Sequence, residues 1–91
     1  MAAKRRSKIE IITDILFLMQ RKGGKVKPTH ILYGGNLSHD RLKIYIDELL
    51  AKQLIEEVDE GEKKFYRITD NGLKLTEELK KIKNVTDAFG L

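Results

Sequence analysis

The stretch Asn36-Leu37-Ser38-His39-Asp40-Arg41-Leu42-Lys43-Ile44-Tyr45-Ile46-Asp47-Glu48-Leu49-Leu50 decides the fold that this sequence predicts. Its apolar residues recur at the three- and four-residue spacing of one helix face, namely Leu42, Tyr45, Ile46, Leu49 and Leu50. Ser38 is the candidate N-cap, and Asp40 in the first turn suits the positive end of the helix dipole. We therefore expect a helix that reaches about Lys52, with buried later turns and an exposed polar and basic start.

A longer helix is expected near the start of the chain. Ser7 and Glu10 form a capping-box pattern, so this helix should begin near Lys8, and Gly23-Gly24 should end it. Its apolar residues form a wide stripe: Ile9, Ile11, Ile12, Ile15, Leu16, Leu18 and Met19. So wide a stripe predicts contact on two sides, either around a small core or with a partner chain.

A short helix should lie between these two. Lys25-Val26-Lys27 is a basic connection that can form a one- or two-residue β-bridge. Pro28 suits the first turn of a helix, where its missing N–H costs nothing. The buried face of this helix should hold Ile31 and Leu32, with Tyr33 as a further candidate, and Gly34-Gly35 should end it.

The second half of the chain predicts a β-hairpin followed by a helix. Residues 55–58 and 64–68 read as strands, joined by a glycine-containing loop over residues 59–62. Asn71-Gly72 is itself a hairpin signal, but Thr69 is a good N-cap. Apolar residues at helical spacing follow it, namely Leu75, Leu79 and Ile82. We therefore favour a helix to about Lys83 over a second hairpin.

Composition limits the class of protein. Ninety-one residues make one small domain, and an apolar share of 41% fits a globular chain. There is no cysteine, so neither a disulfide nor a thiolate metal site is possible. The longest apolar run, Ile15 to Met19, is far shorter than a membrane span. We expect a cytoplasmic protein that does not associate with membranes.

The net charge of +4 is unevenly distributed. Residues 1–30 carry eight basic and two acidic side chains, whereas residues 53–62 carry five acidic and no basic ones. A basic N-terminal third is the kind of asymmetry that binds phosphate or anionic lipid. The alternative is an ordinary solvated surface with an unattached basic tail.

The expected order of elements is that of a winged helix-turn-helix, a mainly helical α+β fold with three helices, a two-stranded hairpin wing and a C-terminal helix. The most specific residues for this comparison are Tyr33-Gly34-Gly35-Asn36-Leu37-Ser38, followed by Tyr45-Ile46, Leu49, Ile68-Thr69-x-x-Gly72 and the segment Lys4 to Ile12. They resemble the small archaeal winged-helix DNA-binding proteins, including the ten-kilodalton chromatin-associated type and ArnR-like transcriptional regulators. The resemblance spans residues 4 to about 82.

The resemblance implies a double-stranded DNA-binding protein, either a transcriptional regulator or a chromatin-associated protein of the nucleoid, that acts as a homodimer. It divides the chain into a basic arm (1–7), a winged helix-turn-helix domain (8–69) and a C-terminal helix (70–91) that supplies the dimer contact. The candidate dimer residues are Leu75, Leu79, Ile82 and Phe89. In the chromatin-associated type the last helix is long and pairs as a coiled coil. Here only about three turns are expected before Asn84, so we expect a smaller interface.

The candidate DNA contacts follow from how a helix enters the major groove. Side chains near its N-terminal end reach base edges, and Arg41 is the best base-reading candidate because guanidinium binds guanine bidentately. Ser38 is either a contact or only a cap. The full set is Ser38, His39, Arg41 and Lys43, with Lys27 and Thr29 for phosphate, Lys4, Arg5 and Arg6 as an arm, and Lys63 and Lys64 on the hairpin.

The acidic residues of the hairpin argue in part against DNA binding. Its five acidic residues are Glu56, Glu57, Asp59, Glu60 and Glu62, and they repel phosphate. Lys63, Lys64 and Arg67 on the returning strand offset them, so we expect only a partial hairpin contact with DNA. The competing hypothesis is a winged helix that binds another protein instead of DNA.

The sequence offers no candidate for catalysis, a metal or a cofactor. Ser38-His39-Asp40 contains the residue types of a catalytic triad, but consecutive helical residues point about 100° apart. His30 and His39 are the only histidines, and neither glycine pair matches a nucleotide-binding pattern. The aromatic residues Tyr33, Tyr45, Phe65 and Tyr66 are expected to be core residues rather than base-stacking ones, and Tyr66 is the one that we expect to be exposed.

Overall fold

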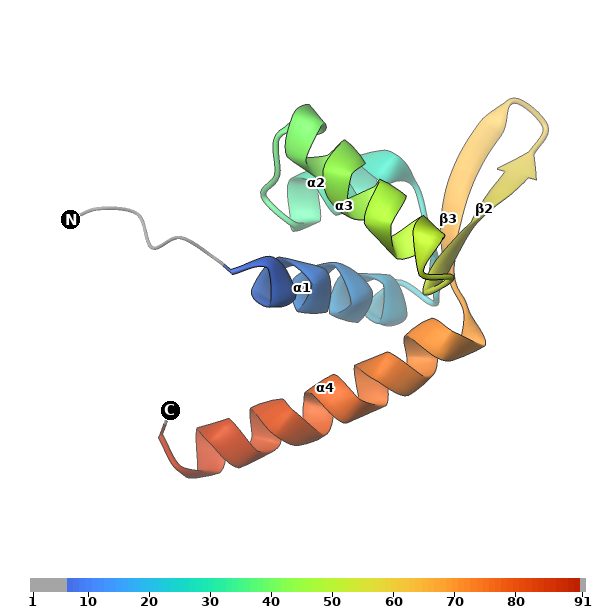
Figure 1. Ribbon diagram of the computed structural model, residues 1–91. Coiled ribbons are helices and arrows are strands. Elements are labelled where there is room, and N and C mark those ends of the chain that lie inside the picture. Colours follow the sequence, from blue (N-terminus) through green and yellow to red (C-terminus); the bar gives the residue numbers. More distant parts are fainter. Residues whose placement is uncertain (1–6, 91) are drawn as a thin grey trace.

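The computed structural model describes residues 7–90 as four helices and a three-stranded sheet (Figure 1). In chain order the elements are α1 (Lys8–Arg21), β1 (Lys25–Val26), α2 (Pro28–Gly34), α3 (His39–Ala51), β2 (Ile55–Glu60), β3 (Lys63–Ile68) and α4 (Asp70–Ala88). All strand pairs are antiparallel and the sheet order is β1-β3-β2. The predicted order is confirmed, including the short bridge formed by β1.

Helix α1 is the centre of the molecule. It lies between α2 and α3 on one side and α4 on the other (Figure 1). The predicted capping box is present, because the Ser7 hydroxyl accepts from the Glu10 N–H and the Glu10 carboxylate accepts from the Ser7 N–H. Ile15, Leu16 and Met19 are completely buried, which explains the wide apolar stripe without a partner chain. Ile9 is the exception, since it is exposed.

The connection between α2 and α3 depends on small residues. A Cβ at Gly34 would lie 2.8 Å from Leu18 Cδ2, so this glycine lets α2 pack closely on α1. Asn36 then adopts a φ of 53°, the left-handed conformation that asparagine tolerates better than most residues. The chain thereby reverses within a few residues, and α3 crosses above α1 (Figure 1).

The hairpin of β2 and β3 projects away from the helices (Figure 1). It is longer than predicted, because Asp59 and Glu60 pair with Lys64 and Lys63 instead of forming a loop. The turn is therefore only Gly61 and Glu62, with Gly61 at a φ of 66°. The two additional pairs place an acidic residue of β2 opposite a basic residue of β3, an arrangement that favours strand pairing.

Helix α4 follows the hairpin directly. The Thr69 hydroxyl caps it by accepting from the Gly72 N–H at 3.1 Å, which confirms the helix over a second hairpin. The predicted end near Lys83 is wrong, because the helix continues through Asn84 to Ala88 and contains 19 residues. A single exposed asparagine costs too little helix propensity to end it.

Candidate nucleic-acid interface

The first turn of α3 is fixed by its cap. Ser38 has extended backbone angles, and its Oγ accepts from the Arg41 N–H at 3.3 Å. Ser38 therefore acts as the predicted N-cap, and its exposed hydroxyl keeps further hydrogen-bonding capacity. Asp40 is exposed in the first turn, where its charge suits the helix dipole.

Helix α3 has a buried face and an exposed face. Leu42, Ile46 and Leu49 are buried in the core. At about 100° per residue, the opposite side of the helix carries the exposed residues that we call the outer face: His39, Asp40, Lys43, Ile44 and Asp47. This face is not uniformly basic. The Lys43 Nζ atom lies 3.3 Å from an Asp47 carboxylate oxygen, which partly neutralises its charge.

Arg41 lies at the edge of the exposed side of α3. Its guanidinium donates to the Tyr45 hydroxyl, with 3.4 Å between the Nη2 and oxygen atoms. The next residue on this side is Glu48, which forms an ion pair with Lys8 of α1. Arg41 thus points along the side of α3 that faces α1, where one guanidinium edge remains available to a ligand.

A groove separates α3 from the hairpin. It is lined by Pro28, His39, Asp40, Leu42, Lys43, Ile46, Asp47 and Tyr66. Tyr66 is half-buried in its wall, so the prediction that Tyr66 is the exposed one of these aromatic residues is wrong. Burial raises the pKa of Tyr66, and charges from both walls act on it, since Asp47 raises the pKa while Lys64 lowers it.

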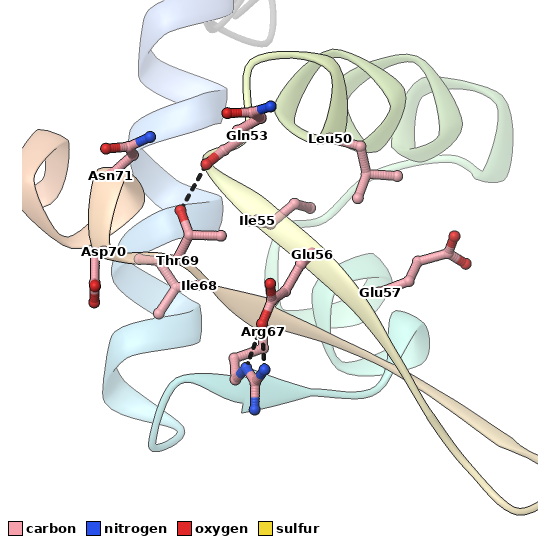
Figure 2. Close-up of a pocket in the computed structure, with 10 residues that line it drawn as sticks. All are labelled: Leu50, Gln53, Ile55, Glu56, Glu57, Arg67, Ile68, Thr69, Asp70 and Asn71. Atoms are coloured by element: carbon pink, nitrogen blue, oxygen red, sulfur yellow. Dashed lines mark hydrogen bonds and ion pairs between the residues drawn. The ribbon is translucent and has the colours of Figure 1, made fainter.

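The charges of the hairpin are largely paired with one another. Lys64 Nζ lies 2.8 Å from a Glu57 oxygen, and this hydrogen bond raises the pKa of Lys64. On the other face of the hairpin Arg67 pairs with Glu56, as Figure 2 shows. Lys25 of β1 pairs with Glu60 at 2.8 Å and lies over the Phe65 ring. Within residues 7–90, Lys63 is the hairpin cation without an ion pair.

The start of α2 adds cationic and polar groups beside this groove. Lys27 is the N-cap of α2, makes no side-chain capping bond and is exposed, as is Thr29. Pro28 between them lines the groove. The structure thus brings Lys27, Thr29 and the start of α3 to one region, whereas Lys4, Arg5 and Arg6 lie outside the described residues.

A large hollow lies at the base of the hairpin, where α3 ends and α4 begins (Figure 2). Two contacts cross its walls. The Thr69 hydroxyl donates to the Gln53 carbonyl at 2.7 Å, and the Glu56–Arg67 pair closes the opposite wall. The first contact ties the start of α4 to the turn after α3 and the second joins the two strands of the hairpin, so we assign this hollow a structural role.

A second exposed surface lies along α1 and α4, which run side by side (Figure 1). Of the candidate dimer residues, Leu79 is only 9% exposed and belongs to the core, and Leu75 packs against the core. Ile82 and Phe89 are 60% and 77% exposed. Ile9 and Val85 add to this apolar surface, which flanks an open groove that also contains Phe17.

Some exposed residues were missed by sequence reasoning. Tyr33 is 78% exposed, so its predicted burial is wrong, because α2 turns only Ile31 and Leu32 toward the core. Ile44 is 63% exposed on the outer face of α3. Its helical position opposite Leu42, Ile46 and Leu49 was the available signal.

Neither a metal site nor a membrane-spanning helix has a candidate among the described residues. Among residues 7–90, no three histidine or carboxylate side chains lie close enough together to hold a metal ion. No helix of this part is long and apolar enough to cross a membrane.

Comparisons with known proteins agree on one architecture. A family model described as winged helix-turn-helix matches residues 5–87. Among solved structures, Sso10a-2, a DNA-binding protein from Sulfolobus solfataricus, is similar with a TM-score of 0.78 and 24% identity, over 92% of this chain and 85% of that chain.

Two more solved structures are similar over most of their length. F93 from STIV, described as a winged-helix DNA-binding protein, has a TM-score of 0.73 and 20% identity, over 86% of this chain and 90% of that one. AF1382 from Archaeoglobus fulgidus has a TM-score of 0.73 and 22% identity, over 88% of this chain and 90% of that one. No curated protein sequence matches.

Proposed function

This chain belongs to the winged helix-turn-helix family, and on that premise we propose that it binds double-stranded DNA with the outer face of α3 in the major groove. The exposure of that face, whose first turn is capped by Ser38, is the observation that carries the proposal. A major groove accepts one α-helix, and the side chains near its N-terminus reach base edges. Two similar structures are themselves described as DNA-binding proteins.

The proposed contacts divide into two kinds. His39 and Lys43 on the outer face are placed to meet base edges, and Arg41 at its edge can reach either a guanine or a phosphate. Lys27, Thr29 and the Ser38 hydroxyl suit phosphate, because they lie at the starts of α2 and α3. The remaining proposed phosphate contacts are Lys63 and Lys64 on the hairpin and Lys4, Arg5 and Arg6 of the arm.

We assign the protein to transcription regulation or chromatin organisation, two roles that differ in the ratio of specific to non-specific affinity. Either role would place it with the nucleoid in the cytoplasm. The uneven charge of α3 favours selective over uniform binding, since this helix carries two basic and three acidic side chains. A helix that bound only phosphates would gain from removing those acids.

The protein acts as a homodimer in this proposal, through the exposed apolar side chains of α1 and α4. Ile82 and Val85 on α4, Phe89 at its C-cap and Ile9 on α1 form an apolar surface that the described chain does not cover. Surfaces of this kind mark interaction sites. Because α4 lies across α1 from α3, a dimer formed there leaves both copies of α3 free for DNA (Figure 1).

A protein-binding module is the second candidate, and the charge of the hairpin favours it. The hairpin carries five acidic and three basic side chains, and the acidic ones repel phosphate. In that case the acidic hairpin would be the binding surface and α3 would serve only to support it.

Titration of duplex DNA at several salt concentrations separates the two. DNA binding predicts that the logarithm of affinity falls linearly with the logarithm of salt concentration. Arg41→Ala should weaken binding about five- to fiftyfold. Lys74→Ala removes one positive charge from α4 and is the matched control, which should change affinity by less than about twofold. No binding at low salt, or equal effects of the two variants, would contradict the proposal.

A further inference from the structure

Ile44 is an exposed apolar residue on the face of α3 that we assign to DNA. It is 63% exposed, and it is the one large apolar side chain of α3 that is exposed to this degree. Its direction is opposite to Leu42 and Ile46, which are buried in the core. Ile44 therefore stands at the middle of the outer face and contributes nothing to the core of this chain.

Its neighbours on the outer face make phosphate an unsuitable partner for the middle of α3. One turn before Ile44 the outer face carries Asp40, and three residues after it carries Asp47. The Lys43 ammonium is 3.3 Å from Asp47 and is partly neutralised by it. Two carboxylates around an isoleucine disfavour an approach by phosphate, whereas base edges present apolar groups and hydrogen-bond donors.

Local structure gives no other reason for this residue. Isoleucine has a lower helix propensity than alanine, leucine or lysine, so an exposed helix position gains nothing from it. The exposed apolar side chains Ile82, Val85 and Phe89 belong to α4 and its C-cap, and α4 lies across α1 from this helix (Figure 1). Ile44 is thus separate from the apolar surface that we assign to the homodimer.

We infer that Ile44 contacts the C5-methyl group of thymine in the major groove and thereby selects DNA with a thymine under the middle of α3. The thymine methyl is the apolar group that base pairs present in that groove, and apolar side chains recognise it by direct contact. The inference rests on the proposed binding of DNA through α3, and it adds the base that the helix selects.

The size of the effect follows from the area that one methyl group contributes. Burying a single methyl or methylene group changes affinity by about fourfold. A contact in an open groove at one position in each DNA half-site should therefore give a preference of about three- to tenfold for thymine over uracil, which lacks only that methyl group.

The test uses a duplex selected by the full chain from random DNA, made once with thymine and once with uracil at every thymine position. The wild-type protein should bind the thymine duplex about three- to tenfold more tightly. Ile44→Ala should bring this ratio close to one, and Ile44→Val should retain most of the ratio. Leu73→Ala, a partly exposed apolar residue of α4, is the control and should leave the ratio unchanged.

The outcomes separate this inference from the proposed function. If wild-type protein binds both duplexes equally, or if Ile44→Ala keeps the wild-type ratio, Ile44 does not read thymine although DNA binding stands. If the wild-type protein binds neither duplex at low salt, the proposed function itself fails and the inference fails with it. Because Ile44 is exposed and alanine is the better helix former, the variant should fold normally.

Discussion

At the scale of single residues, Gly72 shows how a local sequence signal can indicate the wrong element. Asn71-Gly72 is typical of a hairpin turn, yet here both residues lie in the first turn of α4. The Thr69 cap decides the outcome, because its hydroxyl accepts from the Gly72 N–H. Glycine is needed for a different reason: a Cβ at this position would lie 2.1 Å from the Leu54 carbonyl oxygen.

Replacing Gly72 should therefore destabilise the fold. A Cβ would collide with backbone, which cannot move aside like a flexible side chain, so Gly72→Ala should lower the free energy of unfolding by about 2–4 kcal/mol. Asn71→Ala is the control, since Asn71 is exposed in the same turn and should change stability by less than about 0.5 kcal/mol. Urea unfolding measures both, and equal midpoints for the two variants would show that the close approach is absent.

The limits of sequence reasoning are also clearest for single residues. The caps Ser7, Ser38 and Thr69 could be predicted, because capping depends on residues within one turn. The exposure of Tyr33 could not be predicted with the same success, since a seven-residue helix offers too few positions to define its buried side. The exposed direction of Ile44 follows from helical spacing in the sequence. Its proposed contact with thymine depends in addition on the charged residues around it.

At the scale of elements, the two faces of the hairpin should contribute differently to DNA binding. Directly opposed residues of an antiparallel pair share a face, so Glu57 with Tyr66 and Asp59 with Lys64 face the groove beside α3. Glu56 and Arg67 pair on the opposite face. The acidic residues on the groove side should weaken DNA binding, and the acidic residues on the opposite face should have a smaller effect on it.

Neutralising the groove side of the hairpin should therefore strengthen DNA binding. Glu57→Gln with Asp59→Asn removes two negative charges and releases Lys64 from its partner, so affinity should rise about three- to tenfold at low salt. Glu77→Gln with Glu78→Gln removes the same charge from α4 and is the control. If both pairs raise affinity equally, only net charge matters, and the hairpin does not approach DNA.

Helix α4 matters through its length. The sequence suggested an end near Lys83, but the helix reaches Ala88 and carries Val85 as a further exposed apolar residue. The Thr86 hydroxyl donates to the Lys83 carbonyl at 2.8 Å within this continuation. About five turns instead of three enlarge the surface available for a partner copy.

The proposed dimer predicts different effects for two isoleucines of similar exposure. Ile82→Ser should convert the protein to a monomer at tens of micromolar, because a polar hydroxymethyl group replaces apolar contact area. Ile44→Ser changes the same residue type on α3 and should leave the dimer intact. Light scattering measures the mass of each, and a monomeric wild-type protein would exclude this interface.

At the scale of the whole molecule, the order of elements and the fold class could be predicted because both depend on apolar periodicity and on glycine and capping signals. The three-dimensional arrangement of the candidate site could not be predicted from the sequence. Pairing of β1 with β3 and the placement of Tyr66 against α3 depend on contacts between residues far apart in sequence. Sequence reasoning identified the groups on α3, whereas the structure shows which of them share a face.

The central claim is that DNA binds to the outer face of α3, and amide chemical-shift mapping of the labelled protein with a duplex tests it most directly. Shifts at saturating DNA should concentrate in residues 38–47 and at the start of α2, with smaller shifts in the groove side of the hairpin. Amides of α4 from Leu75 to Ala88 should move little, since α4 lies across α1 from this face. Shifts centred on α4, or on Glu56 and Arg67 with α3 unchanged, would contradict the account.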